Sequence, residues 1–180
     1  LFRIHMKNKP LAPVHYAQAA MKWIAIVLLA GAGLARADSP QRVTPLPKYQ
    51  QECAACHLAY PPGMLPAASW KRLMGSLDKH YGTDASLDEA SVREISGWLQ
   101  THAGTYKRVS EEPPQDRITR SQWFVRKHSE VDPQIWKQAA VKSAANCAAC
   151  HTAADKGSFR ESEIQFPKGL DARFRRNWSD

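Results

Sequence analysis

The pentapeptide Cys-Ala-Ala-Cys-His occurs twice in the chain, at 53–57 and at 147–151, and the two copies use all four cysteines. Two cysteines one helical turn apart can reach the two vinyl groups of a porphyrin. The histidine that follows then lies beneath the ring and can ligate the iron. We therefore expect two covalently attached haem c groups. The residues concerned are Cys53, Cys56 and His57 for the first, and Cys147, Cys150 and His151 for the second.

Three other chemistries use paired cysteines. A redox dithiol needs an exposed cysteine of low pKa, usually within a βαβ unit, and neither copy is flanked by strand-like sequence. A zinc site needs a second ligand pair at fixed spacing, whereas each pair here is followed directly by its own histidine. Two disulfides are the third alternative, because the N-terminal sequence indicates export to an oxidising compartment. The histidine after each pair favours haem over all three.

A second axial ligand decides whether a haem iron only carries electrons or also binds small molecules. The chain after residue 37 offers further candidates: His80, His102, His128, Met64 and Met74. A methionine on the first haem, which would raise its reduction potential, is the alternative to a histidine.

His80 follows the helical pattern of residues 67–82, which we expect to end at Gly82. At about 100° per residue it shares one face with apolar side chains, namely Trp70, Leu73, Met74 and Leu77. A histidine on such a face is often an ordinary core residue. Two haems in a small core favour a ligand instead, and we expect His80 to close the first haem.

His102 and His128 are both candidates for the second haem. His102 ends a helix that we expect to start with a capping box at Ser86 and Glu89, and there it could equally bond free carbonyls at the negative end of the helix dipole. His128 shares an arc with Phe124 and Val125. His80 follows His57 by 23 residues and His128 precedes His151 by 23. This inverted spacing favours His128, with His102 as the alternative.

The beginning of the chain indicates export. Met21 and Lys22 precede the apolar run IAIVLLAGAGLA and the cleavage pattern Ala-Arg-Ala. We expect residues 1–20 to be a spurious upstream extension and 21–37 a signal peptide cleaved before Asp38; an uncleaved anchor is the alternative. Five of the 25 basic residues and none of the 17 acids precede Asp38. The remaining charge, near +3, gives no argument for nucleic-acid binding.

The sequence predicts an all-α fold with two small haem lobes. Segment 104–116 breaks the helical periodicity and carries Pro113-Pro114, as a linker does. We expect a first haem lobe over 38–110 and a second over 111–180.

The residues between the two cysteine motifs carry a resemblance. The order CAACH, YPPGMLP, SW, LMG and HYG, then RIT, WFVRKH and NCAACH, resembles the small exported dihaem cytochromes c of purple and other Gram-negative bacteria. The likeness runs from about Tyr49 to Phe166 and departs from the family at no motif position.

The resemblance implies two bis-histidine haems, His57 with His80 and His151 with His128. It also implies a periplasmic electron carrier, not an enzyme, that is reduced by a membrane b-type cytochrome and donates to a small c-type haem protein with an open iron. The alternatives are a small dihaem peroxidase, which needs a five-coordinate iron, and a haem-based redox or gas sensor.

Overall fold

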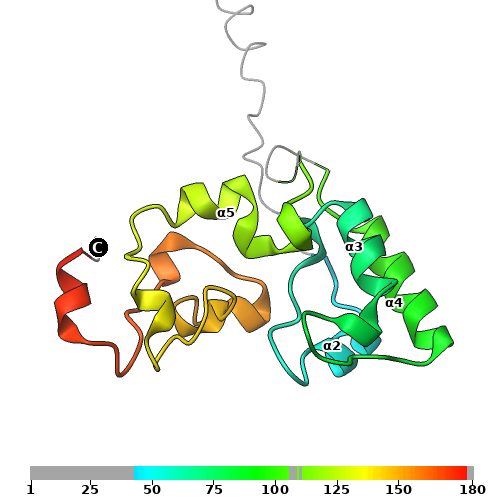
Figure 1. The fold of residues 1–180 in the computed structure, drawn as a ribbon, viewed down its shortest axis with the longest axis horizontal. Coiled ribbons are helices and arrows are strands. Elements are labelled where there is room, and N and C mark those ends of the chain that lie inside the picture. Colours follow the sequence, from blue (N-terminus) through cyan, green and yellow to red (C-terminus); the bar gives the residue numbers. More distant parts are fainter. Residues whose placement is uncertain (1–42, 106–108, 110, 178–180) are drawn as a thin grey trace, which may run out of the picture. The chain divides into compact units, whose positions relative to one another are not determined.

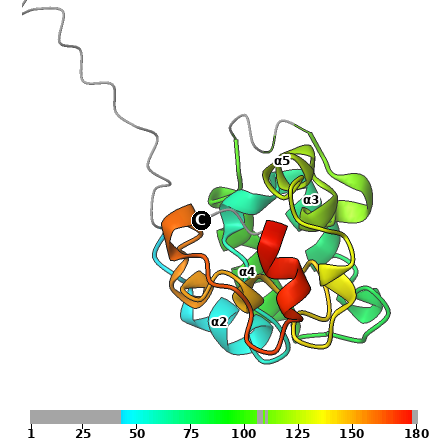
Figure 2. The ribbon, with the colours of Figure 1, turned by 90° about the vertical axis from the view of Figure 1, so that its left-hand side faces the viewer.

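A computed structural model of the protein describes residues 43–105, 109 and 111–177. The expected upstream extension and signal peptide lie outside these residues. The described part belongs to one compact unit, residues 42–180, and is built from helices and irregular segments (Figures 1 and 2). None of its helices has the length and apolarity to cross a membrane.

The all-α prediction is confirmed for the described residues. Their α-helices are α2 (Pro47–Cys53), α3 (Ala67–Met74), α4 (Glu89–Thr101) and α5 (Gln122–Lys127). Single 3₁₀ turns make up most of the remaining regular structure: Pro62–Met64, Leu77–Lys79, Pro114–Asp116, Ile118–Arg120, Ile135–Lys137, Cys147–Ala149, Ala154–Lys156 and Glu161–Glu163, with a longer one over Ala172–Asn177. In place of strands there are two isolated β-bridges, His80 with Thr83 and His151 with Ile164.

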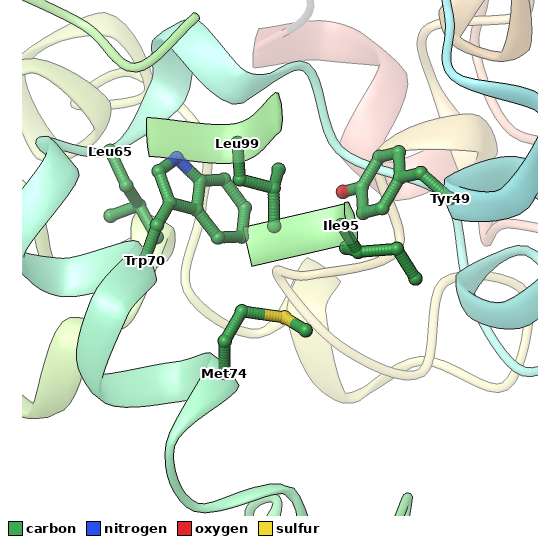
Figure 3. Packing of buried hydrophobic residues seen from close by; sticks show 6 residues of the cluster. All are labelled: Tyr49, Leu65, Trp70, Met74, Ile95 and Leu99. Atoms are coloured by element: carbon green, nitrogen blue, oxygen red, sulfur yellow. The ribbon is translucent and has the colours of Figure 1, made fainter. Parts of the chain in front are cut away.

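The first hydrophobic cluster lies where α4 packs against α3 and α2 (Figure 3). Burial of each large apolar side chain there stabilises the fold by about 1.5–3 kcal/mol. The buried members are Tyr49, Leu65, Trp70, Met74, Ile95 and Leu99. The one polar group of the Trp70 ring, its indole N–H, donates to the Pro62 carbonyl at 2.7 Å, so this ring is buried without an unpaired donor.

Helix α3 ends eight residues before the sequence pattern predicts. Gly75 caps it, and the Gly75 N–H lies 3.0 and 3.1 Å from the carbonyls of Lys71 and Arg72. Ser76 then leaves the helical region (φ −142°), so His80 is reached through the separate turn Leu77–Lys79. The apolar spacing of this stretch persists across the break, which is why periodicity alone suggested one longer helix.

The N-cap residue of helix α4 is Asp88, and not Ser86 as the expected capping box predicts. The Asp88 carboxylate accepts the Ser91 N–H at 3.0 Å and the Ser91 hydroxyl at 2.6 Å, which satisfies one of the free donors of the first turn. Aspartate competes well with serine for this role because its charge also suits the positive end of the helix dipole.

The second hydrophobic cluster is smaller and is formed by Ile135, Val141, Leu170 and Phe174. Leu170 and Phe174 come from the last part of the chain, so this segment is a component of the core. The predicted arc of α5 is correct for Phe124, which is buried, and wrong for Val125, whose side chain is 58 % exposed. The two residues are adjacent, so a helix of six residues presents them about 100° apart.

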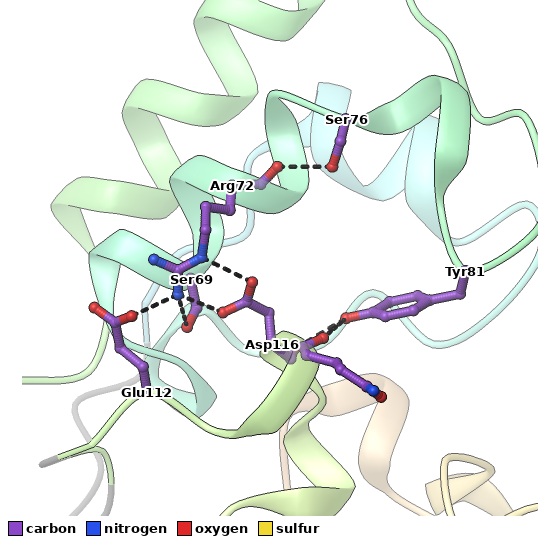
Figure 4. A network of polar contacts seen from close by, with 7 residues as sticks. Ser69, Arg72, Ser76, Tyr81, Glu112 and Asp116 are labelled. Carbon is purple, nitrogen blue, oxygen red and sulfur yellow. Dashed lines mark hydrogen bonds and ion pairs between the residues drawn. The ribbon is translucent and has the colours of Figure 1, made fainter.

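The linker is fastened to α3 by an ion-pair network (Figure 4). The Arg72 guanidinium donates to both oxygens of the Asp116 carboxylate, at 2.9 and 2.6 Å, and to the Glu112 carboxylate at 2.7 Å. Upstream, Gly104 approaches Gly63 so closely that an added Cβ would lie 2.6 Å from the Gly63 carbonyl oxygen. Glycine is therefore required where the chain leaves α4.

We expect the Asp116→Asn variant to be less stable than the unaltered protein. Hydrogen bonding from the Arg72 guanidinium holds the pKa of the Asp116 carboxyl below its ordinary value of 3.8. A depressed folded pKa gives stability that is present above the unfolded pKa and is lost as the pH falls through the folded value. The variant should melt roughly 3 °C lower at pH 7, with the difference shrinking as the pH falls below the ordinary carboxyl pKa of 3.8 and through the lowered folded value.

Thermal unfolding followed by circular dichroism across this pH range measures the effect. Glu161→Gln is the matched control, because the Glu161–Lys127 pair is exposed on both sides and should change the melting temperature by less than about 1 °C. Equal melting temperatures of Asp116→Asn and the unaltered protein at pH 7 would contradict the stabilising role.

Candidate functional site

The structure brings His57 and His80 together. His57 follows the C-terminal end of α2 and the cysteine pair, and His80 follows the turn Leu77–Lys79. The centroids of the two imidazole rings are 6.0 Å apart and the ring planes enclose 21°. The two rings come from segments 23 residues apart, so the pairing depends on how the chain folds between them.

His128 and His151 form a second pair. His128 is the C-cap residue of α5, and His151 follows the turn Cys147–Ala149. Their ring centroids are 6.2 Å apart and the ring planes enclose 79°. The two pairs therefore have nearly the same separation and very different ring orientations.

Both separations fit an iron held between two imidazoles. A metal–nitrogen bond to histidine is about 2.0–2.1 Å long, and a ring nitrogen lies roughly 1 Å from its ring centre, given ring bonds of about 1.3–1.4 Å. Two opposed ligands thus place their centroids about 6 Å apart, as in both pairs. Direct packing of two imidazoles requires no such distance.

One histidine of each pair has its tautomer set by the backbone. His57 Nδ1 lies 2.7 Å from the Leu58 carbonyl oxygen, and His128 Nδ1 lies 2.9 Å from the Phe124 carbonyl oxygen. Because a carbonyl only accepts, Nδ1 carries the proton in both rings, and Nε2 keeps the free lone pair that a metal needs.

The other member of each pair has a buried ring nitrogen without a partner. His80 Nδ1 and His151 Nδ1 are buried and have no hydrogen-bond partner within the described residues, and the same holds for Trp123 Nε1. Burial, with the neighbouring histidine as a smaller cause, lowers the pKa of His80 and of His151, which favours the neutral form that ligates metals. Buried polar groups without a hydrogen-bond partner are rare in native proteins. The unpaired nitrogens here therefore fit a site that is completed by a group which the chain itself does not supply.

The cysteines do not fit the alternative chemistries. None of the four is in a disulfide. Burial raises the thiol pKa of Cys53 and of Cys147 to about 11, whereas a redox dithiol needs a lowered pKa. In the described ranges no group of three or more histidine, cysteine or acidic side chains is arranged to hold a metal ion.

The remaining candidates lie elsewhere. His102 Nδ1 lies 2.8 Å from the Trp98 carbonyl oxygen, the helix-end bond expected for it, and the His102 ring packs against the Trp98 ring with centroids 5.3 Å apart. Met74 is buried in the first hydrophobic cluster, and Met64 lies in the turn Pro62–Met64.

Two tyrosines beside the first pair were not singled out from the sequence. Tyr60 stacks on His57, with ring centroids 5.1 Å apart, and Tyr81 packs edge-on against His80 at 5.0 Å. Each donates its hydroxyl to a backbone carbonyl far along the chain, Tyr60 to Ala145 and Tyr81 to Gln115 and Asp116. The sequence signal for Tyr81 was its position directly after His80, in the His-Tyr-Gly run at 80–82, whereas Tyr60 lies three residues after His57.

The comparisons with known proteins agree with this geometry. The sequence model of the dihaem cytochrome c family matches residues 49–159. A diheme cytochrome c structure from Rhodobacter sphaeroides is 47 % identical, with a TM-score of 0.57 over 65 % of this chain and 99 % of that one. One from Shewanella baltica is 33 % identical, with a TM-score of 0.59 over 68 % and 95 %. A comparison with curated protein sequences gives no match.

We expect the two histidine pairs to give two different electron paramagnetic resonance signals in the ferric protein. Nearly parallel imidazole planes, as in the 21° pair, produce a rhombic low-spin signal, whereas nearly perpendicular planes, as in the 79° pair, produce one dominated by a single large g value. The two signals should integrate to equal amounts. His80→Ala should remove the first alone and His128→Ala the second alone; two identical low-spin signals would contradict the ring geometry.

Proposed function

Since this chain belongs to the dihaem cytochrome c family and so carries two covalently bound haem c groups in an electron-transfer role, we propose that it is a periplasmic carrier in which both irons are closed by histidine on each side. The haems supply the redox chemistry, each iron taking up and releasing one electron. The observation that carries the proposal is the pair of histidine–histidine distances, 6.0 and 6.2 Å.

The protein's own residues keep the sites closed. His57 and His151 follow their cysteine pairs directly, so the thioether attachment itself places them. His80 and His128 come from other segments and would hold each iron from the side opposite His57 and His151. With imidazole on both sides, neither iron offers a position to peroxide or to a gas, and the potential stays lower than a methionine ligand would give.

A dihaem peroxidase or a gas sensor needs one iron with an open or releasable position. The structure pairs all four proposed ligands and leaves His102 bonded to a helix carbonyl. This arrangement favours the carrier over both alternatives.

We further propose that the protein takes electrons from a membrane b-type cytochrome and passes them to a small c-type haem protein with an open iron. The export signal predicted at 21–37 supports a periplasmic location. Docking should use a small, salt-sensitive contact. On α5, Arg126 is exposed beside the exposed Val125, two residues before His128 in the chain, and we propose this cation and apolar side chain as part of the contact.

Replacing the three unattached histidines one at a time tests the ligand assignment. We expect His80→Ala and His128→Ala each to convert one haem to the high-spin form and to bind one equivalent of carbon monoxide rapidly when reduced, because each opens one iron. His102→Ala is the matched control and should stay low-spin. Absorption spectra and flash or stopped-flow kinetics measure both quantities. Rapid, stoichiometric carbon monoxide binding by the unaltered protein would favour the enzyme or the sensor.

The docking proposal predicts that electron transfer to a small high-spin c-type haem protein slows as the ionic strength rises, because screening weakens the attraction between exposed charges. Arg126→Glu should lower the second-order rate by roughly threefold at low salt. Arg93→Glu, an equally exposed site on α4, should leave it nearly unchanged. Stopped-flow mixing of the reduced protein with the oxidised partner measures the rate, and independence from salt would overturn this contact.

A further inference from the structure

The two histidines of the first pair are held very differently by the chain. His57 follows Cys56 directly, so covalent attachment keeps it at the haem. His80 has no such tether. It ends a single 3₁₀ turn, with its N–H 3.3 Å from the Leu77 carbonyl and its own carbonyl accepting the Thr83 N–H at 3.0 Å. Turns of this length are weak by themselves, so His80 needs support from outside its own segment.

Tyr81 supplies a connection of that kind. Its ring packs edge-on against the His80 ring, with centroids 5.0 Å apart. Its single O–H proton is shared between two backbone carbonyls of the linker, with the hydroxyl oxygen 3.1 Å from the Gln115 oxygen and 3.0 Å from the Asp116 oxygen. The Arg117 guanidinium lies over the Tyr81 ring, with its central carbon 4.1 Å from the ring centroid. One aromatic side chain therefore joins the His80 turn to a segment more than thirty residues away.

The backbone at this contact is strained on both sides. Tyr81 has φ +51°, and its two acceptor residues, Gln115 and Asp116, have φ +59° and +53°. Non-glycine residues adopt this left-handed region only when the surrounding structure stabilises it, at a cost of about 1–3 kcal/mol each. Three such residues meeting through one hydroxyl indicate that the contact is built into the fold.

The linker segment that accepts the Tyr81 hydroxyl is also held in place by side-chain contacts. The Asp116 carboxylate is only 14 % exposed and is held by two hydrogen bonds from Arg72. Arg72 lies on α3, which precedes the His80 turn (Figure 4). The connections thus close a ring that runs from α3 through His80 and Tyr81 to the linker and back through Arg72. We call this ring the linker clasp: Arg72, Tyr81, Gln115 and Asp116.

We propose that Tyr81 is a positioning residue for His80: through the linker clasp, its hydroxyl sets how long His80 stays on the iron of the first haem. The inference rests on the proposed function, in which His80 is an axial ligand. Without this shared hydrogen bond the left-handed Tyr81 backbone would lose its stabilising partner, and the short turn would release His80 more often.

The chain offers a matched control. Tyr60 also stands beside a histidine of the first pair, with its ring stacked on His57 at 5.1 Å, and also donates its hydroxyl to a distant carbonyl, that of Ala145 at 2.8 Å. The difference is that His57 is held by its neighbouring attachment. Tyr60→Phe and Tyr81→Phe therefore remove the same atom from equivalent places, but only Tyr81→Phe should affect ligand release.

The test is the rate at which cyanide replaces histidine in the ferric holoprotein, which is limited by histidine dissociation. We expect Tyr81→Phe to raise this rate at the first haem by up to about tenfold, the effect of roughly one net hydrogen bond, and to leave the second haem unchanged. Tyr60→Phe should stay within about twofold of the unaltered protein. Arg72→Met, which leaves Tyr81 in place but frees Asp116, should give a smaller rise in the same haem.

Two results would overturn the proposal: Tyr81→Phe with an unchanged rate, or equal increases in Tyr81→Phe and Tyr60→Phe, which would reflect general loosening. Should Tyr81→Phe fail to fold, Arg72→Met decides alone, and an unchanged rate there counts against the clasp. His80→Ala separates this inference from the proposed function. A first haem that stays low-spin in His80→Ala refutes His80 as a ligand, whereas a high-spin one combined with an unchanged rate in Tyr81→Phe refutes only the clasp.

Discussion

The proposed function imposes one requirement on the arrangement of this protein: a second imidazole must face each histidine of a cysteine motif at the distance that an iron spans. The cysteine motifs place His57 and His151 without further help. Everything else in the fold has to deliver His80 and His128 to ring separations of 6.0 and 6.2 Å. The histidines of the cysteine motifs are positioned by covalent attachment, whereas His80 and His128 are positioned by the fold. The structure around His80 differs from that around His128.

His128 is delivered by a helix end. It caps α5, its Nδ1 bonds to the Phe124 carbonyl one turn earlier, and its ring stacks on the buried Phe124 ring with centroids 4.0 Å apart. His80 lacks both supports: its Nδ1 has no partner within the described residues, and its turn is short. The linker therefore has two roles, because it connects the two hydrophobic clusters and also holds the His80 turn through Tyr81.

The small size of the hydrophobic clusters has the same origin. The first is built mainly on α-helices of seven to thirteen residues, too short to be stable without tertiary contacts, and the second on 3₁₀ turns and irregular segments. Buried polar groups beside them, such as Trp123 Nε1 and His151 Nδ1, lack partners in the described part of the chain. Both features suit a fold in which the cofactor completes the interior.

The sequence by itself determined the attachment chemistry, the all-α class and the family, because these depend on local spacing: cysteines three apart followed by histidine, and motif order along the chain. It also predicted His80 and His128 as partners, which the structure places opposite His57 and His151. It could not show that α3 ends at Gly75, since the apolar period continues through the break, nor that Val125 faces outward. The ring angles of 21° and 79° and the clasp through Tyr81, Asp116 and Arg72 were decided only by tertiary structure, because they join segments whose separation in the chain carries no periodic signal.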